Sequence, residues 1–325
     1  MKSVLIRTDA SVAMGSGHVM RCVTVAECLR DRGCDVIFMM EPLPGNLIEW
    51  VKAKGFLVVQ NFQPVDVCII DHYGIDEGWE RSIRDDVKKI VVIDDLANRR
   101  HDCNMLIDQN MVPNFESRYD TLVPDHCHKL LGPIYLIMRD EFIQARRQAK
   151  VRDGRVHNVL VFMGGSDPTN ETMKVLNALN GSSFTKVDVV VGASNVMKQD
   201  IELLCAEAGY TFYCQIDYMA RLMEQADFSF GAGGSTTWER CYVGLPSSST
   251  IVADNQLITT ETAANLGAVY NVGWHEEVTV ETYRTLIQSL QTERVKWKQM
   301  SERGMELTES PRPNPWIDTI MELME

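Results

Sequence analysis

The chain has 325 residues, of which 45% are hydrophobic and 24% are charged, and its net charge at pH 7 is −13. This length and composition predict an ordinary globular protein of two domains. An acidic balance disfavours non-specific binding to nucleic acid or to an anionic membrane, although backbone amides and a few local cations can still hold a small anionic ligand.

The cysteines and the apolar runs indicate the cellular compartment in which we expect the protein. Nine cysteines are present and none forms a C-x-x-C pair. The odd count, the chain length and the lack of a signal peptide favour reduced thiols in a cytoplasmic protein. The N-terminus "MKSVLIR" reads as a first strand, and no run approaches the roughly 18 apolar residues that a membrane span needs. We therefore expect neither a membrane nor nucleic acid as a partner.

The first half of the chain alternates short apolar strands with helices. Helices are expected near 17–32 and over 47–55. Such alternation is typical of a parallel sheet that is buried on both faces. The expected strands are 3–7, 34–40, 56–59, 65–71, 89–94 and 104–108.

The pattern stops at the charged segment 139–156, which reads as a helix end and a linker, and then restarts. Residues 157–179 predict a strand, a Gly-Gly turn and a helix, with Asp167 as N-cap and Pro168 at the first helical position. Further strands are expected at 186–192, 210–214, 226–232, 247–253 and 268–273.

We therefore predict an α/β protein of two Rossmann-like domains, residues 1–150 and 151–325, facing a cleft. The N-terminal domain is expected to carry the catalytic base and the C-terminal domain to bind the nucleotide. A Pro-rich break after residue 309 precedes a short amphipathic helix. In two-domain proteins of this shape such a helix can cross back onto the first domain.

A glycine-rich turn, Gly15-Ser16-Gly17, leads directly to His18 and a helix. The positive end of the helix dipole disfavours imidazolium, so we expect His18 to be neutral at pH 7. A neutral imidazole can take a proton from water, which suits a general base. The alternative is a helix-capping histidine without chemistry.

Two further glycine turns follow strands of the second half. Residues 164–167 lack both the full dinucleotide fingerprint and the Gly-Lys-Ser/Thr of a P-loop, so alone they indicate only a tight connection. In "GAGGSTTWERCYVGLPS", residues 231–247, Ser235, Thr236 and Thr237 open a helix, where amides and hydroxyls can hold an anion. Glu239 could accept both hydroxyls of a ribose, so this motif fits a nucleotide-sugar. The alternative is a helix start with capping hydroxyls.

Polar residues also follow other strands. Asp254, Asn255 and Gln256 could read sugar hydroxyl or amide groups, or could form a polar loop with an N-cap. Two adjacent carboxylates, Asp94 and Asp95, are candidates for a metal site. No histidine or third carboxylate lies at ligand spacing, so we interpret them as capping and loop residues and expect no metal.

Seven motifs together resemble a known family. They are "RTDASVAMGSGHVMRC", "DHYGID", "VVIDDLANRRHDCNMLIDQN", "LLGPIYLIMRDEF", "FMGGSDPTNET", "GAGGSTTWERCYVGLP" and "ADNQ", in order over roughly residues 1–273. The chain resembles the UDP-2,4-diacetamido-2,4,6-trideoxy-β-L-altropyranose hydrolases of pseudaminic acid synthesis, whose relatives take part in spore-coat polysaccharide synthesis. That family looks like a glycosyltransferase-B fold, similar to the enzyme that adds N-acetylglucosamine to lipid I.

The resemblance implies that water attacks the anomeric carbon with inversion and that UDP leaves, without a metal or other cofactor. It implies that His18 is the general base, that Ser235 and Thr236 lie near the diphosphate, and that Glu239 binds the ribose. Tyr73 and Asn255 match positions that face the sugar. The other residues expected to contact the substrate are Gly17, Arg21, Ser166, Gly233, Gly234 and Gln256.

One segment departs from the expected pattern. "SSSTIV", residues 247–252, is more polar than the apolar strand we expect there, and relatives of the family act on other nucleotide-activated diacetamido sugars. Three alternatives to the hydrolase stay open: a glycosyltransferase of the same fold, a hydrolysing 2-epimerase, and a silent sugar-nucleotide-binding protein. Release of free sugar and UDP without an acceptor distinguishes the hydrolase from the glycosyltransferase. The configuration of the product at C2 distinguishes the epimerase. Unchanged activity in His18→Ala, with UDP still bound, would favour the binding protein.

Overall fold

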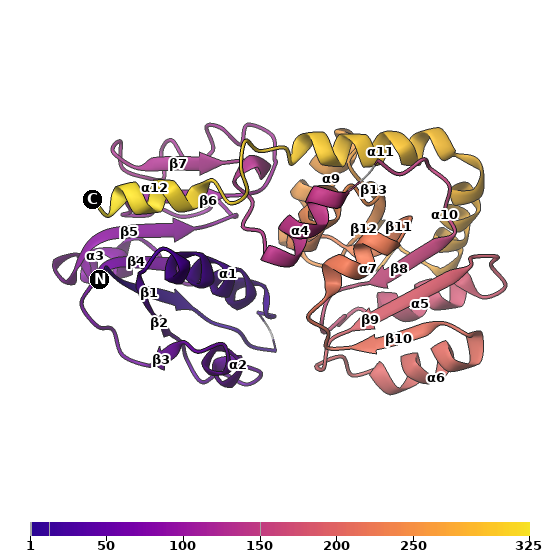
Figure 1. Ribbon diagram of the computed structural model, residues 1–325, viewed down its shortest axis with the longest axis horizontal. Helices are drawn as coiled ribbons and strands as arrows, with labels where there is room; N and C mark the ends of the chain where they lie inside the picture. Colours follow the sequence, from indigo (N-terminus) through magenta and orange to yellow (C-terminus); the bar gives the residue numbers. More distant parts are fainter. Residues whose placement is uncertain (1, 13, 150) are drawn as a thin grey trace. The chain divides into compact units, whose positions relative to one another are not determined.

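The computed structural model describes residues 2–12, 14–149 and 151–325. They form two compact units (Figure 1). Unit 1 runs to Met138 and takes in Ser310–Glu325, and unit 2 is Arg139–Glu309. The boundary between the two domains was expected between residues 150 and 151. Each unit is an α/β layer structure around a parallel sheet, which confirms the predicted fold class.

Unit 1 contains a seven-stranded parallel sheet in the order β3-β2-β1-β4-β5-β6-β7. Its helices are α1 (Gly17–Asp31), α2 (Ile48–Ala53), α3 (Glu77–Ser82) and α12 (Trp316–Leu323), with 3₁₀ turns η1 (Arg84–Asp86) and η2 (Pro133–Tyr135). Its strands are β1 (Ser3–Thr8), β2 (Asp35–Met39), β3 (Leu57–Val59), β4 (Val65–Asp71), β5 (Val87–Ile93), β6 (Met105–Asp108) and β7 (His128–Leu131). The six predicted strands are confirmed. Edge strand β7 was missed because its sequence, HKLL, has no apolar run.

Unit 2 contains a six-stranded parallel sheet in the order β10-β9-β8-β11-β12-β13. Its strands are β8 (Asn158–Phe162), β9 (Lys186–Val191), β10 (Thr211–Cys214), β11 (Phe228–Ala232), β12 (Ser247–Ile251) and β13 (Tyr270–Trp274). Its helices are α4 (Asp140–Gln148), α5 (Glu171–Leu179), α6 (Lys198–Ala208), α7 (Met219–Gln225), α8 (Ser235–Tyr242), α9 (Leu257–Asn265), α10 (Val280–Thr292) and α11 (Arg294–Leu307), with a 3₁₀ turn η3 (Asp254–Gln256). All six strands lie where the sequence predicts them.

Both sheets reverse their strand order beside the first strand. In unit 1 the reversal lies between β1 and β4, and in unit 2 it lies between β8 and β11. Open α/β sheets bind ligands outside the carboxyl ends of the strands at such a switch point. The loops after β1, β4, β8 and β11 are therefore the expected ligand-binding loops.

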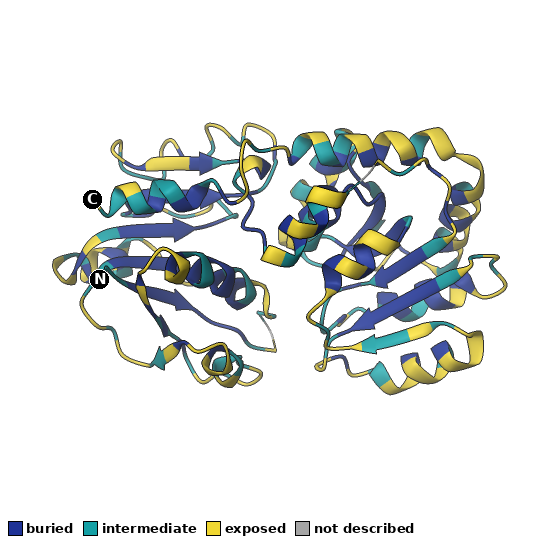
Figure 2. Cartoon of the chain, in the orientation of Figure 1, coloured by how far each residue is buried: buried dark blue, intermediate teal, exposed yellow. Residues whose placement is uncertain are grey.

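The strands are buried on both faces, as Figure 2 shows for the central strands of each sheet. In β1, Val4 and Ile6 pack into one core cluster, whereas Leu5 packs into the cluster on the opposite face. This is the two-residue period of a strand. Trp316 and Ile320 of α12 belong to the same cluster as Val4, so the last helix completes that core of unit 1.

Two local predictions were wrong. Helix α5 begins at Glu171 rather than at Pro168, and its N-cap is Asn170 with a φ of +58°. The Asp167 carboxylate still caps it, because it accepts bonds of 2.9 Å from the backbone amides of Glu171 and Thr172. The segment 139–156 was expected to be a helix end and a linker, but it begins with a complete helix, α4. Phe142 of this helix is fully buried, so the helix is packed against the protein.

We predict that Ile320→Ala destabilises the protein by about 2–5 kcal/mol, because it leaves a cavity in a core where Ile320 is 0% exposed. Urea denaturation monitored by tryptophan fluorescence measures the change. Exposed Glu322 in the same helix provides the matched control, Glu322→Ala. Equal stability of the two variants would show that α12 contributes nothing to the core.

Candidate active site

His18 lies at the switch point of unit 1. Gly15 adopts a φ of +76°, and its backbone amide donates to Ser11 at 2.8 Å, which closes the turn after β1. Helix α1 then starts at Gly17, so His18 is its second residue. The side chain is largely buried, and its Nδ1 lies 2.6 Å from a carboxylate oxygen of Asp71, the last residue of β4. The imidazole is therefore held by a charged partner rather than by apolar packing.

Arg21 binds the same carboxylate. Its Nε and Nη2 donate to the two oxygens of Asp71, each at 2.8 Å. Residues three apart on a helix share a face, so His18 and Arg21 reach Asp71 together. Burial alone would raise the pKa of Asp71, but Arg21 and His18 outweigh it and hold that pKa well below its usual range.

The ionised carboxylate sets the tautomer of His18. A carboxylate only accepts hydrogen bonds, so Nδ1 of His18 must carry the hydrogen that Asp71 receives. In the neutral ring, Nε2 is then the nitrogen with the free lone pair. This tautomer is the one that a general base needs if it is to take a proton through Nε2.

Tyr73 lies against the imidazole. The rings of His18 and Tyr73 meet edge to face with centroids 4.4 Å apart, and the Tyr73 hydroxyl donates to Asp95 at 2.8 Å. Nη1 of Arg21 lies 3.7 Å from the other oxygen of Asp95. The structure thus brings together His18, Arg21 and Tyr73, three of the predicted site residues, with Gly17 exposed beside them.

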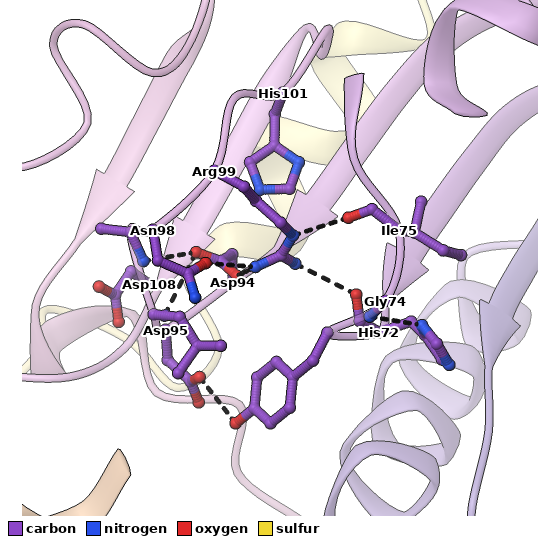
Figure 3. Close-up of polar contacts among 12 residues, drawn as sticks. His72, Gly74, Ile75, Asp94, Asp95, Asn98, Arg99, His101 and Asp108 are labelled. Atoms are coloured by element: carbon purple, nitrogen blue, oxygen red, sulfur yellow. Dashed lines mark hydrogen bonds and ion pairs between the residues drawn. The ribbon is translucent and has the colours of Figure 1, made fainter. Parts of the chain in front are cut away.

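Arg99 ties the loop after β5 to the loop after β4 (Figure 3). It donates to Asp94 at 2.7 Å and to the backbone carbonyls of Ile75, at 2.7 Å, and His72, at 3.1 Å. The second oxygen of Asp94 accepts from two backbone amides of its own loop. This confirms the interpretation of Asp94 as a loop-capping residue. Over residues 2–12, 14–149 and 151–325, no cluster of three or more His, Cys, Asp or Glu side chains could hold a metal ion.

In unit 2 the glycine-rich loop follows β11 at the switch point. Gly234 adopts a φ of +97°, and α8 starts at Ser235 without a side-chain N-cap. Ser235 is exposed and Thr236 half-buried. The first turn of a helix presents amides without intrahelical partners, and an anion can bind them. The geometry therefore suits the predicted role of this turn.

The turn η3 packs against the same loop. A Cβ atom at Gly233 would lie 2.7 Å from the Thr260 hydroxyl and 3.0 Å from Oε1 of Gln256, so only glycine fits here. Gln256 is fastened in turn, because its Oε1 accepts from the Val252 amide at 3.0 Å. Asn255 is exposed beside it. Half-buried Ser166 follows β8, the strand that pairs with β11.

Glu239 has a partner that the sequence analysis missed. Nη2 of Arg139 donates to Glu239 at 3.1 Å, and its Nη1 lies 2.6 Å from Glu141. Arg139 lies in the segment that the sequence predicts to be a helix end and a linker. Asp71 was missed as well, although a lone carboxylate at the end of the buried run "VDVCII" was the available signal.

Asp108 is a buried acid at the end of β6. Its carboxylate accepts from Arg118 at 3.0 Å and from the Asn110 amide at 2.9 Å, and the Tyr119 hydroxyl lies 3.3 Å away. Burial, only partly offset by these donors, raises its pKa from 3.8 to about 7.

No protein-family model matches the chain. Three curated proteins are similar to it. "Uncharacterized protein MJ1062" of Methanocaldococcus jannaschii is 29% identical over 75% of this chain, which spans only 54% of that protein. The UDP-2,4-diacetamido-2,4,6-trideoxy-beta-L-altropyranose hydrolase of Campylobacter jejuni is 29% identical over 59% of this chain and 70% of its own. The spore coat polysaccharide biosynthesis protein SpsG of Bacillus subtilis is 27% identical over 85% of both. These names confirm the resemblance that the motifs predicted.

Solved structures share the fold. The chain superposes on MurG of Acinetobacter baumannii with a TM-score of 0.63 and 17% identity, covering 99% of this chain and 100% of MurG. It superposes on UGT89C1 of Arabidopsis thaliana, a structure complexed with UDP, with a TM-score of 0.69 and 12% identity over the whole of both chains. The fold is of the glycosyltransferase-B type, as predicted. Within the described residues, no helix is both long and apolar enough to span a membrane.

We predict that Asp108→Asn stabilises the protein at pH 8.5 relative to wild type, by on the order of 1 kcal/mol, and that the gain fades by about pH 5. The folded state holds the Asp108 proton more tightly than the unfolded state does. The stability that protonated Asp108 contributes is fully present below pH 3.8, the ordinary pKa of the group. It is lost as the pH rises through about 7, the pKa of Asp108 in the folded protein. Asparagine stays neutral and avoids this loss.

Thermal unfolding of both proteins across this pH range measures the difference for Asp108→Asn. Asp125→Asn, at an exposed aspartate, is the control. A difference between Asp108→Asn and wild type that does not change with pH would contradict the prediction.

Proposed function

We propose that the chain is a nucleotide-sugar hydrolase that cleaves the anomeric C–O bond of a UDP-linked 2,4-diacetamido-2,4,6-trideoxy hexose with inversion, releasing UDP and the free sugar. The observation that carries the proposal is the bond between Nδ1 of His18 and Asp71 at a switch point of the sheet. It leaves Nε2 as the proton acceptor on a side chain that a helix start and a buried ion pair hold in place.

In the proposed reaction, Nε2 of His18 takes a proton from water while the water oxygen bonds to C1 of the sugar. Asp71 stabilises the imidazolium that forms, because it keeps its negative charge throughout. Tyr73 packs against one edge of the ring and limits its rotation. One well-placed general base contributes about 10²–10⁴-fold to the rate.

The C1–O bond breaks as water attacks, and its electron pair stays on the diphosphate oxygen of UDP. That oxygen gains negative charge and needs donors that are already in position. In the proposal, the amides and hydroxyls at the start of α8 supply them, with Ser235 and Thr236 nearest the diphosphate and Glu239 on the ribose. Unit 1 thus provides the base and unit 2 the nucleotide site.

The choice of sugar rests on the relatives. The protein of Campylobacter jejuni is named for a UDP-linked diacetamido trideoxy sugar, and the resemblance carries this substrate class over to the chain. We assign Asn255, Gln256 and Tyr73 to the sugar because amide and hydroxyl groups can bond to acetamido groups. A glycosyltransferase is the second candidate, because MurG and UGT89C1 have the same fold.

We predict that the purified chain releases free sugar and UDP from the UDP-linked substrate without any acceptor, and that His18→Asn lowers kcat by about 10²–10⁴-fold while UDP affinity is unchanged. The rate of UDP release measures kcat, and calorimetry measures the affinity for UDP. NMR identifies the free sugar and its configuration. His126→Asn, at an exposed histidine of the same unit, is the control. Release only after an acceptor is added would favour the glycosyltransferase, and equal losses of turnover and binding would remove His18 from its role.

We predict that Glu239→Gln raises KM for the nucleotide-sugar severalfold with a smaller change in kcat, because the ribose contact is made equally in the ground and transition states. Glu141→Gln is the matched control, since Glu141 pairs with the same Arg139. Steady-state kinetics separates the two parameters. An unchanged KM in Glu239→Gln would place the ribose elsewhere.

A further inference from the structure

Arg240 is a fully buried cation without an acidic partner. It lies on α8, its side chain is among the largest that are completely enclosed, and no carboxylate pairs with it among the described residues. Burying an unpaired charge is costly, so a protein that keeps one needs a reason for it. Burial lowers the pKa of Arg240 to about 10, which still leaves it charged at neutral pH.

The guanidinium packs directly beneath the glycine-rich loop. A Cβ atom at Gly231 would lie only 2.3 Å from Nη1 of Arg240, so the side chain fits because residue 231 is glycine. Nη2 donates to the Ala232 carbonyl at 3.0 Å and to the Thr237 hydroxyl at 3.1 Å. Arg240 therefore fastens the loop on one side and the first turn of α8 on the other.

The polar strand β12 supplies the remaining contact. Ser249 pairs in register with Gly231, and its hydroxyl accepts from Nη2 of Arg240 at 3.0 Å. This explains part of the unexpected polar segment at 247–252. All three acceptors of Arg240 are neutral, and within the described residues its Nε has no partner at all. No carboxylate forms an ion pair with Arg240 among the described residues, and Glu239, the preceding residue, offsets its charge only through space.

We infer that Arg240 is a positioning residue for anion binding, which holds the Gly231–Gly234 loop from behind and adds its positive charge to the N-terminal end of α8. This rests on the proposed function, because the anion it favours is the diphosphate of the nucleotide. Arg240 does not touch the ligand. It acts through the loop backbone and through its field, which is weakly screened in a buried position.

Arg152 provides a matched control in the same unit. It is half-buried, has its pKa lowered to about 10 by burial, and donates to the backbone carbonyls of Val243 and Met223. Val243 follows the last residue of α8, so Arg152 lies at the opposite end of this helix. Loss of its charge removes a half-buried arginine without changing the glycine-rich loop.

The test is calorimetric binding of UDP, with uridine titrated by NMR, to wild type, Arg240→Gln and Arg152→Gln. We expect Arg240→Gln to weaken UDP binding by about tenfold or more while uridine binding is nearly unchanged, because only UDP carries the diphosphate charge. Arg152→Gln should lower stability but keep both affinities. Equal losses for UDP and uridine in Arg240→Gln, or no loss for UDP, would overturn the inference.

If circular dichroism shows that Arg240→Gln does not fold, the same binding measurements are made on Arg240→Lys. Lysine keeps the charge, so the ratio of UDP to uridine affinity should stay near that of wild type, and a collapse of this ratio would overturn the inference. If wild type binds no UDP, the proposed function fails together with the inference. If wild type binds and releases UDP normally but the Arg240 variants bind it equally well, only the inference fails.

Discussion

The carboxylate of Asp71 is the constraint on which unit 1 depends. A buried carboxylate is unfavourable unless strong donors surround it, and here the guanidinium of Arg21 and the imidazole of His18 both donate from one face of α1. The same contacts therefore do two things at once. They dock α1 against the end of β4, and they fix the tautomer of His18. Packing and the proposed chemistry depend on the same group at this position, because Asp71 orients the imidazole of His18 and also holds the helix that carries it.

The two units place opposite charges at equivalent points of one topology. Unit 1 buries an anion, Asp71, and pairs it with the guanidinium of Arg21, whereas unit 2 buries a cation, Arg240, among neutral acceptors. Both charges lie beside the switch point, where the strand order reverses. The first arrangement favours proton acceptance by a neighbouring imidazole, and the second favours binding of an anion. A repeated fold thus supports two different tasks through a change in the sign of one buried group.

The sequence predicted the strands well because buried parallel strands are short apolar runs, and it made His18 a candidate because a glycine-rich turn is a local signal. It did not reveal Asp71, Arg99 or Arg240 as supporting residues. Their partners depend on which strands are neighbours: β1 lies beside β4, so His18 meets a residue 53 positions away. Spacing along the chain carries no information on such a pairing. The polar strand β12 looked anomalous for the same reason, since the buried guanidinium beside Ser249 is visible only in three dimensions.

The return of α12 to unit 1 has a consequence for biosynthesis. Unit 2 is one uninterrupted segment, whereas the core of unit 1 needs Trp316 and Ile320, which the ribosome adds only after the whole of unit 2. The N-terminal half therefore emerges from the exit tunnel with an apolar face still uncovered, and it waits while unit 2 is translated and can already fold. Nascent chains with such exposed surface are the natural clients of chaperones. Unit 1 therefore begins to form before unit 2 and is completed after it.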